Sequence, residues 1–477
     1  MEFAWVVEPA TTLYRTNSFA FEVEPPVDFR IVPRWLWWRI ALIALHSHWT
    51  LLRPCRIVLP IRLEPGERET WERLLDYEST TVDVYADAPL NGAVRIEEGA
   101  DEPDRGNLSD PAAARFATAF SGGKDSLLQA GMLAEFTHSP LLVTLTSDLP
   151  PQQDHHTSRR RYVLDEVRRR REVELVEVTS GVRAAYDNYY GRDRGIPISV
   201  NELSDGMVYL AATLAVSAAR GASQVCVASE IENQVTAEID GRIIGCAFLS
   251  DVVVFGALSA ILSPAGITVE SLISPLRSGH VQALLWQRYR DLADLQYSCW
   301  LVKEPCAACS ACDKCALVAF RMLRAGHDPG DVGIDLRRTI AWIAGWHPVA
   351  NGSHGFRLPT QVVGRELDRE LARLVAVVPL ATVSRLDWRA GLALAKQKLR
   401  FRKYRDGQPG YWPQYLRFLH PKLGHDLGPV LAASFTAAFS EGAVNAARAE
   451  RMIGWMTEPV VKAQQHEEGR ERSSRPS

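Results

Sequence analysis

Short apolar segments alternate with helical segments through the middle of the chain, and this alternation limits the fold more than any other feature. The apolar segments read as buried strands, at 116–120, 141–146, 173–178 and 224–228. Helical patterns lie between them, at about 126–136, 157–171 and 203–220. Strands separated by helices pair in parallel, so the pattern predicts an α/β fold with a doubly wound parallel sheet. Ligands of such sheets bind at the carboxyl ends of the strands, where the strand order reverses.

The flanking segments differ in composition from this region. Residues 1–96 combine β-like runs such as 56–61 with a Trp-rich helical stretch at 35–52, and they predict a separate N-terminal α+β domain. The segment 97–112 is acidic and broken by Gly and Pro, which is typical of a linker. At 477 residues the chain is long enough for two or three domains. The remaining predicted units are the α/β domain at 113–325, a helical C-terminal region at 326–461 and a disordered tail at 462–477.

Charge and apolar patterning exclude several classes of protein. The net charge of -3 is too small for a general binder of polyanions, so nucleic-acid contact would need a local patch. The apolar stretch 35–52 is interrupted by Arg39, His46 and His48, and it predicts a buried amphipathic helix rather than a membrane span. The N-terminus lacks the pattern of a signal peptide. We therefore expect a cytoplasmic protein, in which clustered cysteines hold metal more often than they form disulfides.

A glycine-containing loop lies between the first strand and the first helix of the α/β region. Its residues are Ser121, Gly122, Gly123, Lys124, Asp125 and Ser126. Glycines permit backbone angles that let amide groups converge on an anion, and the helix start favours negative charge. The serine hydroxyls and Lys124 can hold phosphate, and Asp125 can help to hold Mg²⁺. The spacing is not that of the Walker loop. A strand, this loop and a helix in succession nevertheless predict a phosphate site.

The loop resembles the SGGxDS signature of the PP-loop, or N-type, ATP pyrophosphatase superfamily, and the resemblance covers about 115–320. It implies a fold like that of the adenine-nucleotide α-hydrolases, with ATP and Mg²⁺ bound at the loop. ATP would be split so that AMP becomes attached to a substrate oxygen and pyrophosphate leaves from the loop. The resemblance also implies that adenine lies against the end of the second strand, here around 144–148.

Five of the eight cysteines lie within the seventeen residues from 299 to 315. Repeated Cys-x-x-Cys spacing lets several sulfurs converge on one tetrahedral Zn²⁺. We favour Cys299, Cys309, Cys312 and Cys315 as the four ligands and leave Cys306 unassigned. Four thiolates leave no open position for water, so the zinc would be structural. An iron–sulfur cluster, or a redox or unliganded set of thiols, stays an alternative.

Two PP-loop families combine such a loop with downstream Ser-Cys and Cys-x-x-Cys motifs. The 7-cyano-7-deazaguanine synthases begin close to the loop and end soon after the cysteines, whereas this chain extends well beyond both. The UDP-N-acetylmuramoyl-L-alanyl-L-glutamate epimerase family is more similar in layout, because it has an N-terminal domain and a C-terminal extension. Segments 228–233 and 274–278 resemble its Ser-Asn-Glu and Arg-Pro-Leu-Ser motifs, the second in altered order.

The resemblance to the epimerases implies that the enzyme is an isomerase, an epimerase rather than a ligase. It would adenylate a carboxylate of a peptidoglycan precursor or a related peptide, and so act in cell wall biogenesis. The mixed anhydride has lost the carboxylate charge, so the α-proton of the glutamyl centre becomes more acidic and a modest base can remove it. Lys124 and Asp125 would act at the loop, Arg277 would anchor a carboxylate or phosphate, and Glu230 is a candidate base. The other candidate bases are Glu232, Asp205 and His280.

Two other functions stay open. One is a 7-cyano-7-deazaguanine synthase-like or tRNA-modifying activity. The basic stretches 157–171 and 396–422 could bind a polyanion such as tRNA. Solvent-exposed or packed helix faces explain these two stretches equally well. The other is a nucleotide-binding module without catalysis, against which the intact Ser121, Asp125 and Ser126 argue. We expect a small-molecule or peptide-like carboxylate as partner, with nucleic acid not favoured and no membrane contact. The sequence leaves the oligomeric state undetermined.

Overall fold

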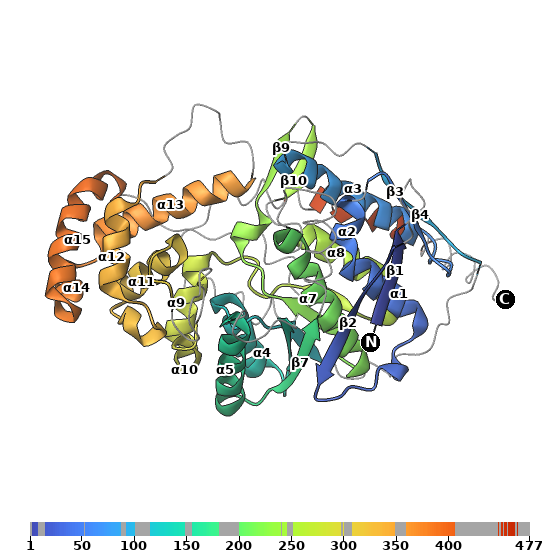
Figure 1. Ribbon diagram of the computed structural model, residues 1–477, viewed down its shortest axis with the longest axis horizontal. Coiled ribbons are helices and arrows are strands. Elements are labelled where there is room, and N and C mark those ends of the chain that lie inside the picture. The colour runs from blue at the N-terminus through green and yellow to red at the C-terminus, as the bar shows by residue number, and fades with distance from the viewer. Residues whose placement is uncertain are drawn as a thin grey trace, which may run out of the picture.

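A seven-stranded sheet forms the centre of the molecule, in the order β1-β2-β7-β6-β5-β8-β11 within the part of the chain that the structure describes (Figure 1). The structure is a computed structural model. It describes residues 2–7, 15–51, 53–86, 92–100, 115–147, 155–180, 200–239, 241–245, 251–296, 299, 308–348, 359–405, 447, 450–451, 453–455, 457–462 and 465.

Five neighbouring strands of the sheet are parallel. They are β5 (Phe116–Ala119), β6 (Leu141–Ser147), β7 (Glu174–Ser180), β8 (Gln224–Val227) and β11 (Thr268–Glu270). The first of them along the chain, β5, is central, with β6 and β7 on one side and β8 and β11 on the other. The predicted α/β class with a parallel sheet is therefore confirmed. The strand order reverses between β5 and β8, where such sheets place their ligands.

Helices cover both faces of the parallel strands, because alternate side chains of each strand enter different apolar cores. Ala117, Val143 and Val225 face one core, which they share with α7 (Val200–Ala219) and α8 (Val252–Leu262). Phe116, Leu142 and Cys226 face the other core. Its helices are α4 (Lys124–Phe136), α5 (His155–Arg170), α9 (Ser278–Arg288) and α10 (Arg290–Ala293). The predicted strands and helices of this region are confirmed, with shifts of a few residues at their ends.

The N-terminal segment joins the sheet. Strand β2 (Arg15–Glu24) pairs antiparallel with β7, and β1 (Glu2–Val7) pairs with β2. Helix α1 (Arg34–Ala44) packs on α7, and its buried Trp35 and Leu36 belong to the same apolar core as Ala117. The predicted unit 1–96 therefore shares both a sheet and a core with the α/β region, and most of the predicted linker lies outside the described residues.

The helical stretch predicted at 35–52 is divided at Leu45 into α1 and a second short helix. A small parallel sheet of β3 and β4 and the long helix α3 complete this region. The bounds are α2 (His46–Leu51), β3 (Cys55–Val58), α3 (Glu67–Ala86) and β4 (Val94–Glu97). Strands β9 (Thr236–Ile239) and β10 (Arg242–Gly245) form a hairpin. The 3-10 turns within the described residues are η1 (Phe29–Ile31), η3 (Ile231–Gln234), η5 (Ser263–Ala265), η6 (Pro329–Val332) and η7 (Arg402–Tyr404).

The C-terminal part of the described chain is helical, as predicted, and forms the end of the molecule opposite the N-terminal segment (Figure 1). Its helices are α11 (Asp313–Ala325), α12 (Leu336–Gly345), α13 (Pro359–Val377), α14 (Leu380–Leu386) and α15 (Trp388–Phe401). Helix α11 joins two cores: Val318 packs with the sheet domain, and Phe320 packs with α13 and α15. None of the described helices has both the length and the apolar character that a membrane crossing requires.

Candidate active site

The glycine loop turns directly from the central strand β5 into α4. Gly122 has φ 75, a left-handed conformation that strongly favours glycine, and Gly123 is the N-cap of α4. The Gly123 amide donates to Ser121 Oγ (3.4 Å), and Ser126 Oγ donates to the Gly123 carbonyl (3.0 Å). The two serine oxygens are 3.3 Å apart. The loop is thus a short closed turn at the start of a 13-residue helix, at the edge where the strand order reverses.

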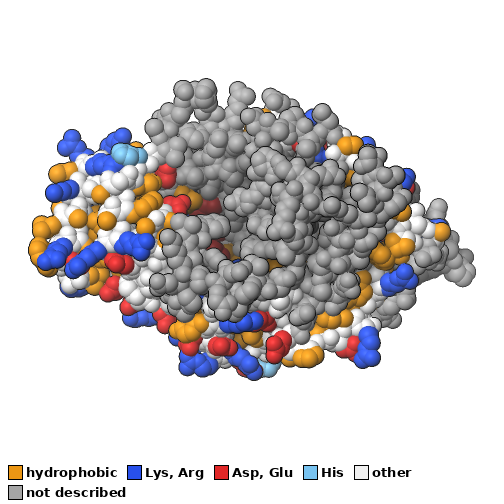
Figure 2. Space-filling view, viewed as in Figure 1, with side chains coloured by type: hydrophobic (Ala, Val, Ile, Leu, Met, Phe, Trp, Pro, Cys, Tyr) orange, Lys and Arg blue, Asp and Glu red, His pale blue; other side chains and the backbone are white. Residues whose placement is uncertain are grey.

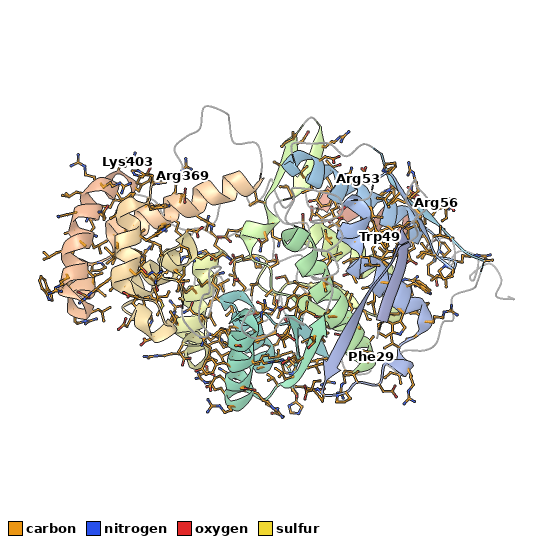
Figure 3. All side chains as sticks on the ribbon, in the orientation of Figure 1. Phe29, Trp49, Arg53, Arg56, Arg369 and Lys403 are labelled. Atoms are coloured by element: carbon orange, nitrogen blue, oxygen red, sulfur yellow. The ribbon has the colours of Figure 1, made fainter. Side chains whose placement is uncertain are left out.

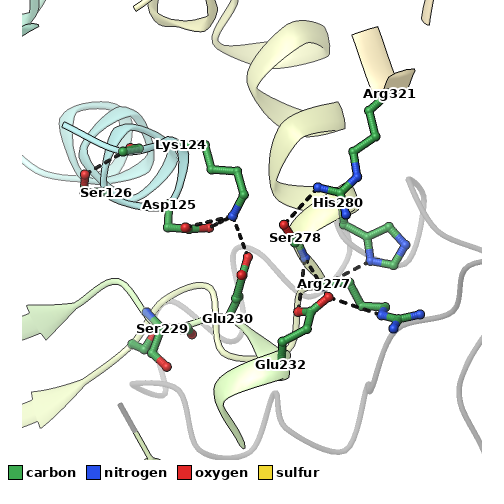
Figure 4. A network of polar contacts seen from close by, with 12 residues as sticks. Lys124, Asp125, Ser126, Ser229, Glu230, Glu232, Arg277, Ser278, His280 and Arg321 are labelled. Carbon is green, nitrogen blue, oxygen red and sulfur yellow. Dashed lines mark hydrogen bonds and ion pairs between the residues drawn. The ribbon is translucent and has the colours of Figure 1, made fainter. Parts of the chain in front are cut away.

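Lys124 connects this loop to the end of β8. Its ammonium Nζ lies 2.6 Å from Asp125 Oδ1 and 2.8 Å from Glu230 Oε2 (Figure 4). Glu230 follows β8, the strand next to β5 on the far side of the switch point. The two loops on either side of the crevice therefore meet through one buried ammonium group. The structure brings together three of the four predicted catalytic residues: Lys124, Asp125 and Glu230.

The three groups have different protonation preferences. Burial by itself would lower the pKa of Lys124, but Asp125 and Glu230 outweigh burial and raise it. Burial would raise the pKa of Asp125, but the Lys124 ammonium holds that pKa below its ordinary value. Burial, reinforced by the Asp125 carboxylate, raises the pKa of Glu230 well above its ordinary value. The two carboxyl groups that share this site are therefore shifted in opposite directions, Glu230 toward its protonated form and Asp125 toward its ionised form.

Arg277 lies a short distance away, bound to a second carboxylate. Its guanidinium Nε is 3.4 Å from Glu232 Oε1, and both oxygens of Glu232 accept from the Ser278 amide at 3.2 Å (Figure 4). Arg277 is the N-cap of α9, so Glu232 sits at the positive end of that helix. Burial raises the pKa of Glu232 despite the Arg277 charge. Arg277 and Glu232 thus form a second polar group beside the triad, connected to it through the short turn that carries Glu230 and Glu232.

The C-terminal helices supply one wall of this second group. Arg321 of α11 donates to Ser278 Oγ (2.9 Å) and binds both carboxylate oxygens of Glu370 on α13 (2.9 and 3.0 Å). The Arg321 guanidinium overcomes burial and lowers the pKa of Glu370 to about 2. The region beyond residue 325 therefore contributes directly to the surroundings of Arg277. Ser278 belongs to the segment 274–278 that resembles the Arg-Pro-Leu-Ser motif, whereas no motif in the sequence marks Arg321 or Glu370.

His280 is a poor proton acceptor in this structure. It lies on the first turn of α9, where its Nδ1 accepts from the Arg277 amide (3.4 Å). Burial first, and then the positive charge of Arg277, lower its pKa to about 3. The ring is therefore neutral near pH 7, and the structure supports a structural role for it. The side chain of Asp205 lies outside the described residues.

The four cysteines proposed as zinc ligands come together. The sulfurs of Cys299, Cys309, Cys312 and Cys315 all lie within 4.8 Å of one another, so this cluster could hold a metal ion. Backbone amides point at the sulfurs: the Cys309 amide donates to Cys299 Sγ (3.2 Å) and the Cys315 amide to Cys312 Sγ (3.4 Å). Such donors stabilise thiolates, and four thiolates are a ligand set that suits zinc. Cys306 lies outside the described residues.

Lys314 lies between two of these cysteines and extends toward the glycine loop. Burial and the nearby Lys124 ammonium lower its pKa to about 8, and Asp125 and Glu230 partly oppose this effect. The cysteine cluster and the loop are thus neighbours in space, although about 190 residues separate them in sequence. Lys314 is not among the predicted site residues, and its signal in the sequence is a lysine placed inside the Cys-x-x-Cys spacing.

The described side chains at the end of β6, where adenine is expected, are buried. The side chains of Thr144 and Thr146 are buried, and Asp148 lies outside the described residues. The Leu145 carbonyl accepts from Arg160 (2.8 Å) and from Tyr209 (2.9 Å). The aliphatic part of Arg160 also passes Gly122, since its Cγ would lie 3.8 Å from a Cβ built at that glycine.

Most of the other cations of the basic helix α5 are paired within the chain. Arg161 binds Glu177, and Arg170 binds Glu166 and Asp294. Arg171, the residue that follows α5, binds Asp291 at 2.6 Å. This pairing reduces the charge that α5 could offer to a polyanion, and it favours a structural role for the arginine runs.

Comparisons with protein-family models, with curated proteins and with solved structures found no match. The resemblance to PP-loop enzymes therefore stays a prediction that rests on the loop and its surroundings.

Proposed function

We propose that the chain is an AMP-forming PP-loop enzyme that adenylates a carboxylate and releases pyrophosphate. One observation carries the proposal: the loop from Ser121 to Ser126 lies at the switch point of a parallel sheet, and its Lys124 reaches Glu230 from the adjoining strand end at 2.8 Å. Amide groups at a helix start, two hydroxyls and a buried ammonium are a chemical set suited to a polyphosphate.

The roles proposed at the loop follow from charge. Lys124, released from Asp125 and Glu230, would bind phosphate oxygens and stabilise the leaving pyrophosphate. The ionised Asp125 would hold Mg²⁺, which when bound neutralises phosphate charge. Lys314 would add a second cation from the side of the cysteine cluster, and a zinc ion held by that cluster would fix the start of α11.

The proposed substrate is a glutamyl-type peptide whose second anionic group binds Arg277. Adenylation of its carboxylate would make the α-proton acidic enough for removal by a general base. Burial and the Asp125 carboxylate raise the pKa of Glu230 well above its ordinary value, so Glu230 is suited to return a proton to the carbanion. Return of the proton on the opposite face would invert the centre, and attack of water on the mixed anhydride would then restore the carboxylate and release AMP. This is the reaction of the UDP-N-acetylmuramoyl-L-alanyl-L-glutamate epimerase family, which the loop and the cysteine motif resemble.

The proposal is tested by pyrophosphate release from labelled ATP in the presence of carboxylate-containing peptides. The variant Asp125→Asn should lower the rate by roughly 100-fold or more, because it removes the charge that holds the metal. Asp165→Asn is the matched control, since Asp165 is an exposed aspartate on α5. Circular dichroism establishes that both variants fold. Release that needs tRNA instead of a carboxylate, nucleotide binding without release, or full turnover by Asp125→Asn would each overturn the proposal.

A further inference from the structure

The outer face of α15 exposes large apolar side chains. Trp388, Leu392 and Leu399 are 61%, 62% and 71% exposed. Spacings of four and seven residues place them on one side of the helix. The opposite side carries Ala390, Leu394 and Phe401, which are buried in the C-terminal core. Helix α15 is thus held by one apolar face while a second apolar face points away from the protein.

This face lies at the end of the molecule. Helices α14 and α15 form the extreme left of the view, with α12 and α13 to their right (Figure 1). Figure 2 shows hydrophobic and basic side chains gathered on the same end. Leu380 and Leu386 of α14, each 37% exposed, extend the apolar area. The surface belongs to a protruding helical pair and is remote from the N-terminal segment.

The same segment is strongly basic in a chain whose net charge is -3. From 380 to 405 the sequence has eight Lys and Arg residues and one acidic residue, Asp387. Asp387 caps α15 and binds Arg337, so it does not neutralise the face. Two of the cations are internal: Lys398 donates to the carbonyls at the end of α13, and Arg400 donates to those at the end of α12. The exposed cations are Arg385, Arg389, Lys396, Arg402, Lys403 and Arg405.

The aromatic rings on this face are not open platforms for nucleic-acid bases. The Arg389 guanidinium lies over the Trp388 ring, 5.3 Å from its centre. The Lys403 ammonium lies over the Tyr404 ring at 5.1 Å, and Lys403 extends outward at the top of the helical end (Figure 3). Binding of single-stranded nucleic acid relies on aromatic faces that stack with bases, whereas exposed leucines add nothing to it.

We propose that the face formed by α14 and α15 binds the surface of an anionic lipid bilayer. Leucine and tryptophan side chains would enter the boundary between headgroups and acyl chains, and the flanking cations would contact lipid phosphates. A convex helical ridge with apolar residues at its crest and cations beside them has the shape and charge for this role. This proposal differs from the expectation of no membrane contact. That expectation concerns helices that cross a bilayer, whereas binding to a bilayer surface needs no spanning segment.

Co-sedimentation of the full chain with vesicles tests this proposal. Vesicles of phosphatidylglycerol and phosphatidylcholine should bind the protein at low salt, and vesicles of phosphatidylcholine alone should bind it far less. The double variant Arg389→Gln/Lys396→Gln should weaken binding by about 30-fold, since each cation near an anionic surface contributes about a factor of five. Leu392→Gln/Leu399→Gln should weaken binding as well, while the dependence on salt persists.

A matched control lies at the other end of the molecule. Arg56 and Val58 of β3 are exposed, and the variant Arg56→Gln/Val58→Gln changes one cation and one apolar residue away from α15 (Figure 3). This control should bind vesicles like the natural chain, and circular dichroism checks the fold of all three. The proposal is overturned by equal binding to both vesicle types or by unchanged binding of both α15 variants. It is also overturned if the natural chain does not bind vesicles but self-associates or binds an RNA probe, and the α15 variants lose that self-association or RNA binding.

Discussion

At the scale of single residues, the candidate site depends on one buried ammonium group between two carboxyl groups. Lys124 is 6% exposed and contacts both Asp125 and Glu230, so the loop is closed by charge before any ligand arrives. A polyphosphate would have to replace these contacts with its own oxygens. Loop geometry and charge therefore both affect the binding of a polyphosphate at the loop, and each can be tested separately.

The glycine at the apex of the loop provides the test of geometry. In Gly122→Ala the new Cβ would meet Val163 at an ordinary 3.6 Å, so the cost is the left-handed backbone, roughly 1–2 kcal/mol in the free energy of unfolding. Gly241→Ala is the control, because Gly241 has the same φ of 75 and nothing within 4 Å of its Cβ. Urea unfolding should show similar losses for both. Only Gly122→Ala should weaken ATP binding in calorimetry; equal affinities would count against an anion site at the loop.

At the scale of elements, the cysteine cluster fixes the start of α11. Cys312 is the N-cap of this helix, and the Ser310 hydroxyl accepts from the Asp335 amide (2.8 Å) at the start of α12. Ser310 has φ 56, so the turn between the cysteines is held in a conformation that is unfavourable for serine. A metal ion bound by the four sulfurs would stabilise this turn and, through it, Lys314 and Arg321.

We expect the purified chain to contain a single zinc ion held by this cluster. Cys309→Ser should bind zinc roughly tenfold or more weakly and unfold at a lower temperature, because it loses a thiolate ligand. Cys55→Ser is the control, since Cys55 packs against the other apolar core and its thiol donates to the Trp49 carbonyl (3.3 Å). Metal analysis measures the zinc content of each variant, and thermal unfolding measures its unfolding temperature. Zinc-free protein, or full zinc content in Cys309→Ser, would contradict the assignment.

At the scale of the whole molecule, the N-terminal segment and the sheet domain are joined by buried polar contacts as well as by a common core. The Tyr77 hydroxyl on α3 donates to Asp251 Oδ2 at 2.7 Å, and Asp251 caps α8. Asp251 is 1% exposed. Burial raises its pKa to about 6, although the Val253 amide and Tyr77 lower it in part. A carboxyl group at this junction makes the stability of the joined structure depend on pH.

The sign of this dependence follows from the direction of the shift. The folded chain binds the Asp251 proton more tightly than the unfolded chain, so the stability contribution is complete below pH 4 and is lost as the pH rises through about 6. Relative to Asp251→Asn, the natural chain should lose about 3 kcal/mol of unfolding free energy between pH 4 and pH 7. Relative to Asp387→Asn, the natural chain should instead gain stability as the pH rises, and only below about pH 4, because Arg337 lowers the pKa of that half-buried cap. Parallel curves for all three chains would refute the account.

The sequence by itself predicted the elements whose signals are local. Strands β5 to β8, the helices between them and the loop at 121–126 follow from apolar runs, glycine placement and helical periodicity, which neighbouring residues determine. The spacing of the cysteines was also local enough to name four sulfurs that meet within 4.8 Å.

Tertiary structure alone decided which distant residues meet. The pairing of β2 with β7, the reach of Lys124 to Glu230, the approach of Lys314 to the loop and the contact of Arg321 with Glu370 have no local signature. Such contacts arise because apolar faces must pack together and buried charges must find partners, and both depend on how whole elements are placed. The sequence therefore determined the elements and the chemistry of each motif, whereas packing determined their assembly into one site.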